Sequence, residues 1–211
     1  CSLILFLGLH ITYAPLMSLE VLLSLANLFV ITFIYINHQD QRSSTMWFFF
    51  GMQNALYVLI GWFYTSEQMP FFLFFLSMSL YLGVVTFAMV LGHYYLVVPK
   101  LSERPLLHAM RIMWGVFIIK VIWSCWSFVG HQSFFESGTM MGGGYLFNWI
   151  IVTMRWLWGY GAVFVLSIFG YKLAKMRSIQ SATGVYYVMV FFILVGELIS
   201  SYLYHNYRLF L

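Results

Sequence analysis

Long apolar stretches separated by short polar connections dominate this sequence. A helix needs about 20 mostly apolar residues to cross the hydrocarbon core of a bilayer. Six stretches reach that length, and they lie at about 16–36, 46–64, 70–98, 105–130, 145–171 and 179–205. The pattern therefore predicts an all-α fold, a polytopic transmembrane helical bundle with six spans.

The first residues are also apolar, but they are too few to cross a bilayer. Residues 1–14 end at Pro15, and we interpret them as a partial or re-entrant segment, or as the tail of a seventh span truncated at the N-terminus. The first residue is Cys1 and not Met, so we interpret the chain as a processed form or a fragment. We expect residues 1–211 to form a single integral-membrane domain.

The composition excludes several classes of protein. Of the 211 residues, 63% are hydrophobic and only 8% are charged, which is typical of a membrane protein and leaves no room for a soluble domain. The net charge of +4 is not concentrated in a basic run, so we expect no nucleic-acid partner. The expected partners are the lipid bilayer and other membrane subunits. No metal-binding triad, Walker loop or nucleophile motif is present.

Positive charges in the connections predict the orientation of the chain. Six of them lie in the first, third and fifth connections, and they are Arg42, Lys100, Arg104, Lys172, Lys175 and Arg177. Only Arg208 follows the last span. Because loops rich in Lys and Arg stay in the cytoplasm, we expect an integral protein of a bacterial inner membrane with its C-terminus on the outer, non-cytoplasmic side.

Five charged residues lie inside the apolar stretches, and they are Glu20, Arg111, Lys120, Arg155 and Glu197. A charge at the centre of a membrane helix costs at least about 2.5–3.5 kcal/mol, so one that is kept usually faces a partner or a cavity. At a rise of about 1.5 Å per residue, Lys120, Arg155 and Glu197 all lie ~12–16 Å from the outer face. We therefore expect Glu197 to lie within reach of Lys120 or Arg155, and Glu20 to be able to join them.

Two interpretations of this buried charge network remain open. The first is an ion-pair network that fixes the order of the helices. The second is a polar site for an anionic group, a quinone head or a proton relay. The types of residue are compatible with both.

A second polar layer contains two histidines near the cytoplasmic side. His93 and His108 lie on successive spans at similar depth, and two facing imidazoles are what a low-spin b-type haem requires as iron ligands. Arg111 shares a face with His108 and could pair with a haem propionate. The alternative is that each histidine forms hydrogen bonds at the level of the lipid headgroups. His10, His131 and His205 lie at the outer ends, where we expect exposed loop histidines. If the inner pair binds haem, a His131–His205 pair would give a two-haem path across the membrane.

These features lead to one leading functional hypothesis and two rivals. The leading hypothesis is a membrane subunit of an electron-transfer or quinone-linked complex, with haem b or a quinone held by His93, His108 and Arg111. The first rival is a transporter or ion-pathway subunit that uses Lys120, Arg155 and Glu197. The second is a scaffold subunit without chemistry. No catalytic residue can be assigned from the sequence, and whether the protein is an enzyme stays open.

Overall fold

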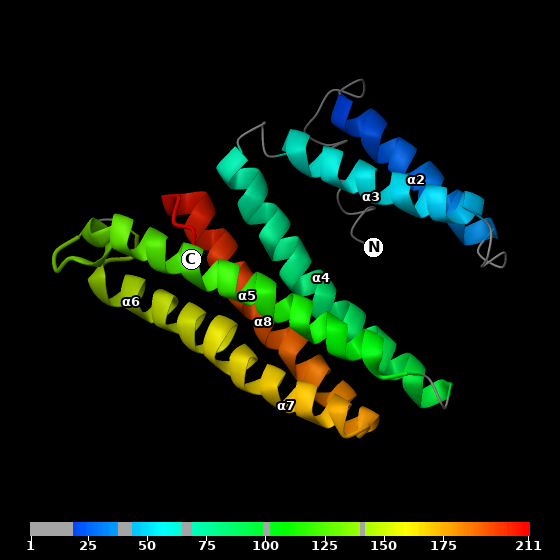
Figure 1. Ribbon diagram of the computed structural model, residues 1–211. Helices are drawn as coiled ribbons and strands as arrows, with labels where there is room; N and C mark the ends of the chain where they lie inside the picture. The colour runs from blue at the N-terminus through cyan, green and yellow to red at the C-terminus, as the bar shows by residue number, and fades with distance from the viewer. Residues whose placement is uncertain (1–18, 38–43, 65–68, 99–101, 140–141) are drawn as a thin grey trace. The chain divides into compact units, whose positions relative to one another are not determined.

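The computed structural model describes residues 19–37, 44–64, 69–98, 102–139 and 142–211, and every regular element in these ranges is a helix (Figure 1). The elements are α2 (Leu19–Asn37), α3 (Ser44–Tyr64), α4 (Met69–Val97), α5 (Arg104–Gly130), η1 (Gln132–Phe135), α6 (Tyr145–Met154), η2 (Arg155–Ala162), α7 (Val163–Lys175) and α8 (Ile179–Tyr207). The prediction of an all-α fold is confirmed.

Five helices of the described residues are long and apolar enough to cross a membrane. They are Thr45–Phe63, Met69–Val97, Arg104–Gly130, Tyr145–Lys175 and Ile179–Tyr207. The stretch expected at about 16–36 forms α2, and its apolar part, Val21–Asn37, is shorter than the other five. The structure thus supports five spans. Segment 1–14 lies outside the described residues, so a seventh span stays a prediction.

Contacts along the chain separate two compact units, Cys1–Leu76 and Ser77–Leu211, with the boundary inside α4. The single membrane domain stays a prediction. In the first unit α2 packs on α3. The buried face of α2 carries Val21, Ser24, Asn27 and Val30, which lie on one side of a helix because they are three residues apart. Gln53 of α3 donates a hydrogen bond to the side-chain oxygen of Asn27.

In the second unit, α7 packs against α8 and against α5 (Figure 1). Residues at helical spacing face the interior, for example Leu106, Met110 and Met113 on α5 and Tyr186, Met189 and Ile193 on α8. All six are fully buried. Such packing gives membrane helices much of their association energy, because lipid tails are as apolar as the side chains themselves.

Helices α6, η2 and α7 form one continuous rod from Tyr145 to Lys175. Its middle section, Arg155–Ala162, is a π-helix, in which the backbone hydrogen bonds join residues five apart. Gly159 and Gly161 lie in this section. π-helical turns inside α-helices are rare and occur frequently at functional sites. This one places Arg155 at its first position, inside the second unit.

Candidate functional site

A cluster of three charged side chains is buried in the second unit. Glu197 of α8 forms two ion pairs at once, with Lys120 of α5 and with Arg155 at the start of η2. The Lys120 Nζ atom lies 3.0 Å from Glu197 Oε2, and the Arg155 Nη2 atom lies 3.1 Å from Glu197 Oε1. The side chains are 3%, 6% and 0% exposed for Lys120, Glu197 and Arg155. The contact that the depth argument predicts is therefore present.

The three charges occupy one layer of the bundle. Lys120 lies ten residues before the end of α5 at Gly130, and Glu197 lies ten residues before the end of α8 at Tyr207. Arg155 follows the start of α6 at Tyr145 by the same number. At 1.5 Å per residue, each lies about 15 Å from its helix end. The regular rise of the helices thus brings residues from distant parts of the sequence together.

Apolar clusters enclose the charge layer on both sides along the helices. On one side lie residues that include Met113 of α5, Val163 of α7 and Ile193 of α8. On the other side a second cluster contains Phe134, Phe135, Val152, Leu203, Leu209 and Leu211. The charges therefore lie in a section of the protein that is closed to solvent, where electrostatic interactions are stronger than in water.

Hydroxyl groups surround the ion pairs. The Arg155 Nη2 atom also donates to the Tyr160 hydroxyl at 2.9 Å, and that hydroxyl is 2.7 Å from Ser124 Oγ on α5. Lys120 Nζ donates to Ser77 Oγ of α4 at 3.4 Å. The guanidinium of Arg155 also lies over the Tyr160 ring, 4.3 Å from its centroid, which adds a cation–π contact. Tyr160 and Ser77 thus contact the two cations directly, and Ser124 holds the Tyr160 hydroxyl.

Two glycines create the space for the arginine. A Cβ atom added at Gly196 of α8 would lie 2.6 Å from the Cα of Gly159 and 2.7 Å from Arg155 Nη1. A Cβ atom at Gly159 would likewise lie 2.7 Å from Arg155 Nη1. The backbones of η2 and α8 therefore touch, and the guanidinium lies beside their contact. Small residues allow membrane helices to approach in this way.

The charges of the cluster do not cancel. Two cations share one carboxylate, which leaves a net charge of +1 when all three groups are ionised. The Arg155 Nε and Nη1 groups have no hydrogen-bond partner among the described residues. Arginine holds its proton under all ordinary conditions, whereas the ammonium group of lysine can release one when it is buried. The arrangement can therefore become neutral if Lys120 gives up a proton.

The two histidines of the second predicted layer are at the surface. His93 of α4 and His108 of α5 are both exposed, and so is Arg111. The Nδ1–H group of His108 donates to the backbone oxygen of Arg104 at 2.7 Å. The structure thus differs from the expected arrangement, in which the two rings face each other inside the bundle. Similar depth does not fix rotation about the helix axis, and both rings are exposed.

The remaining predicted residues contribute no further site. The side chain of Glu20 and the whole of His10 lie outside the described residues. His205 is exposed, and the Nδ1–H group of half-buried His131 donates to the Ser127 carbonyl at 2.9 Å. Among the described residues, no three His, Cys, Asp or Glu side chains gather as a metal site.

Three residues of the site are not predicted from the sequence, and they are Tyr160, Tyr81 and Gly196. Tyr160 follows Arg155 by five residues, which in an α-helix places the two on different faces. The π-helix, with its i→i+5 pattern, brings them together. Gly196 and Tyr81 lie in apolar stretches, and Tyr81 donates to the Gly159 carbonyl at 3.4 Å. The glycine adjacent to Glu197 was a visible signal of a close helix contact.

Comparison with protein-family models, with curated proteins and with solved structures finds no match for this chain.

Proposed function

We propose that this chain is an ion-pathway subunit of a membrane complex, in which the Lys120–Glu197–Arg155 cluster takes up and releases a proton. The observation that supports this proposal is the single carboxylate shared by two fully buried cations. Arg155 keeps its charge under all ordinary conditions, and we assign the exchangeable proton to Lys120.

Stability alone does not account for three charged residues in this position. Replacing a buried ion pair with well-packed apolar residues is often neutral or stabilising by about 1–4 kcal/mol, because the charges lose their hydration. A bundle that needed only rigidity would keep apolar residues in this layer, as it does on both sides of it. Ionisable residues inside a membrane protein are functional by default for the same reason.

We also propose an orientation with six crossings, of which α2 is the first. The Glu103–Arg177 ion pair, with 2.9 Å between Oε2 and Nη2, joins the start of α5 to the segment after α7. The basic residues of these two segments therefore share one end of the second unit, which we assign to the cytoplasm of a bacterial cell. Cysteines introduced at Ser102 and Ser137 should then react with impermeant reagents from opposite sides. Labelling of both from one side would refute this orientation.

Proton flux into proteoliposomes tests the function. The purified chain is reconstituted with a pH-sensitive dye inside, and a potassium gradient with valinomycin sets a membrane potential. We expect dye acidification with the native chain and its loss in Lys120→Met. This variant keeps the neutral Arg155–Glu197 pair, so it should fold and insert normally.

Two matched variants make the result decisive. Lys120→Arg keeps the charge but not a releasable proton, so it should also abolish the flux while retaining the fold. Arg177→Gln removes a cation at the surface and should leave the flux unchanged, since its side chain is 74% exposed. Absence of flux in the native chain, or equal flux in Lys120→Met, would contradict the proposal.

A second candidate is the electron-transfer or quinone-linked subunit. One observation favours it: His108 is exposed and uses Nδ1 in its hydrogen bond to the Arg104 carbonyl, so Nε2 is the ring nitrogen that a cofactor shared with a partner subunit could reach. His93 and Arg111 would complete that site. A reduced-minus-oxidised absorption spectrum of the chain purified with its partners tests this candidate, because b-type haem has characteristic bands.

A further inference from the structure

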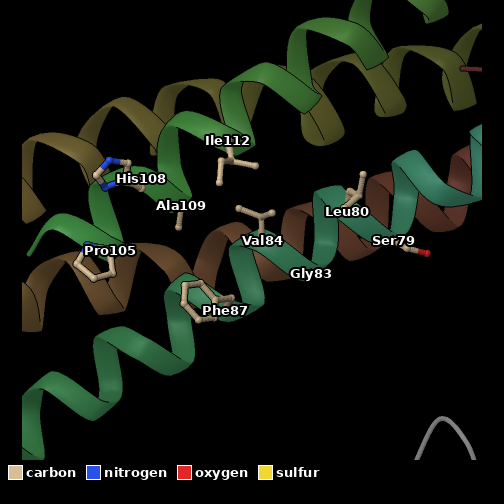
Figure 2. Close-up of a pocket in the computed structure, with 9 residues that line it drawn as sticks. All are labelled: Ser79, Leu80, Gly83, Val84, Phe87, Pro105, His108, Ala109 and Ile112. Atoms are coloured by element: carbon tan, nitrogen blue, oxygen red, sulfur yellow. The ribbon is translucent and has the colours of Figure 1, made fainter. Parts of the chain in front are cut away.

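A groove of about 350 Å³ runs along the outside of the second unit between α4 and α5. Figure 2 shows its lining, with Val84 of α4 and Ala109 of α5 pointing into the space between the two helices. The other lining residues are Ser79, Leu80, Gly83, Phe87, Pro105, His108 and Ile112. Most of these are apolar or small, so the groove offers a hydrocarbon-like surface to the membrane.

Small residues on α4 create this groove. Ser79 and Gly83 lie four residues apart and therefore on one face of the helix. A Cβ atom added at Gly83 would meet no other atom within 4 Å, so the space is truly open. From Ser79 to Phe87 the groove follows α4 for about 12 Å. A long, narrow apolar channel of this kind fits an extended hydrocarbon chain.

Basic side chains lie along the α5 side of the groove. Arg104, His108 and Arg111 of α5 are spaced four and three residues apart, so they share one face, and all three are exposed. The neighbouring acid, Glu103, forms its ion pair with Arg177. No ion pair involves Arg104 or Arg111 within the part of the chain that the structure describes. This face of α5 therefore carries positive charge that is available to an anion.

We propose that an anionic phospholipid binds here, with one acyl chain in the α4–α5 groove and its phosphate between Arg104 and Arg111. Arg104 starts α5 and Arg111 lies about 10 Å further along the helix, so both long side chains can extend to the level of the headgroups. Basic residues next to grooves between membrane helices bind anionic headgroups in this way. His108 lines the groove and lies between the two arginines along the helix.

The test uses the whole chain, delipidated in a neutral detergent, with native mass spectrometry and thermal unfolding as readouts. We expect one molecule of dioleoyl phosphatidylglycerol to bind and to raise the unfolding temperature. Dioleoyl phosphatidylcholine should bind much more weakly. The double variant Arg104→Gln/Arg111→Gln should lose roughly fivefold in affinity for each arginine. Lys172→Gln/Lys175→Gln removes the same charge from exposed residues of α7 and should keep near-native affinity.

A second pair of variants tests the groove itself. Gly83→Leu should fill the groove and displace the lipid, whereas Gly184→Leu adds the same side chain at another exposed glycine with open space and should not. Equal affinity for the two lipids, or equal losses in the two charge variants, would overturn the proposal. So would protection by inorganic phosphate alone, lipid binding by a folded Gly83→Leu variant, or a haem absorption band lost with that variant.

Discussion

Removing Glu197 should destabilise the protein more than removing Glu197 and Arg155 together. In Glu197→Gln, both Lys120 and Arg155 remain in the closed charge layer without a counter-charge. Breaking a buried pair by removing one partner costs about 3–5 kcal/mol. In the double variant Glu197→Gln/Arg155→Gln, only Lys120 remains, and it can become neutral by releasing its proton. The single change should therefore be the more harmful one.

The expected size of the effect is large enough to measure. For a chain of about 200 residues, 1 kcal/mol shifts the unfolding temperature by about 2–4 °C, so Glu197→Gln should lower it by roughly 6–20 °C. Arg155→Gln should lower it less, because Glu197 keeps Lys120 as its partner at 3.0 Å. The double variant should fall between the two single variants.

A double-mutant cycle on thermal unfolding in detergent measures this directly, with circular dichroism at 222 nm or intrinsic fluorescence as the signal. The surface pair provides the control cycle, since Glu103→Gln and Arg177→Gln should shift the temperature little and show a coupling of less than about 1 kcal/mol. If the effects of Glu197→Gln and Arg155→Gln prove additive, the two side chains do not interact in the membrane protein, and the argument from a shared carboxylate is wrong.

Three further predictions follow from individual contacts. Gly196→Ala should cost about 1–3 kcal/mol in unfolding free energy, because its methyl group would lie 2.6 Å from the opposing glycine, whereas Gly184→Ala, with open space around it, should be neutral or stabilising in the same thermal assay. Tyr160→Phe should cost about 1–3 kcal/mol, because the buried donors and acceptors that its hydroxyl satisfies lose their partner. The pKa of Glu103 is held below its usual value, first by a hydrogen bond with the backbone of Glu103 itself and then by the Arg177 guanidinium. The ion pair should therefore stabilise the fold above the unfolded-state pKa and be lost as the pH falls through the lower, folded-state pKa, so Glu103→Gln should flatten the acid side of the pH profile of the unfolding temperature.

The positions of the long helices could be predicted because a bilayer leaves the backbone few alternatives. Every peptide group inside hydrocarbon must be hydrogen-bonded, so a long apolar stretch becomes a helix over nearly its whole length. The stretch expected at 105–130 is α5, Arg104–Gly130, and that expected at 179–205 is α8, Ile179–Tyr207. The length of an apolar stretch is a weaker guide to whether α2 crosses the membrane, because the described apolar part of α2 is short. It does not predict which face of a helix turns inward.

In the candidate site, too, the depth of a residue along its helix could be predicted from the sequence, but the direction in which its side chain points could not. Depth follows from counting residues, so the common layer of Lys120, Arg155 and Glu197 could be predicted. Rotation about the helix axis depends on packing, and His93 and His108 therefore point outward despite their similar depth. The π-helix also changes which residues share a face within the fifth predicted span. Arg155 and Tyr160 are therefore in contact, although α-helical spacing would place them on different faces.

The scaffold and ion-pathway interpretations of the charge cluster differ most clearly at Lys120. A scaffold needs balanced charges, and Arg155 with Glu197 already form a neutral pair at 3.1 Å. Lys120 adds an unbalanced charge to a section that apolar clusters close on both sides, so as a structural element it is a cost. A protein that only held helices together would gain stability by losing this lysine. An exchangeable proton requires an ionisable group beside a carboxylate that already has another partner, and Lys120 lies beside Glu197, which is paired with Arg155. The proposed function therefore depends on Lys120.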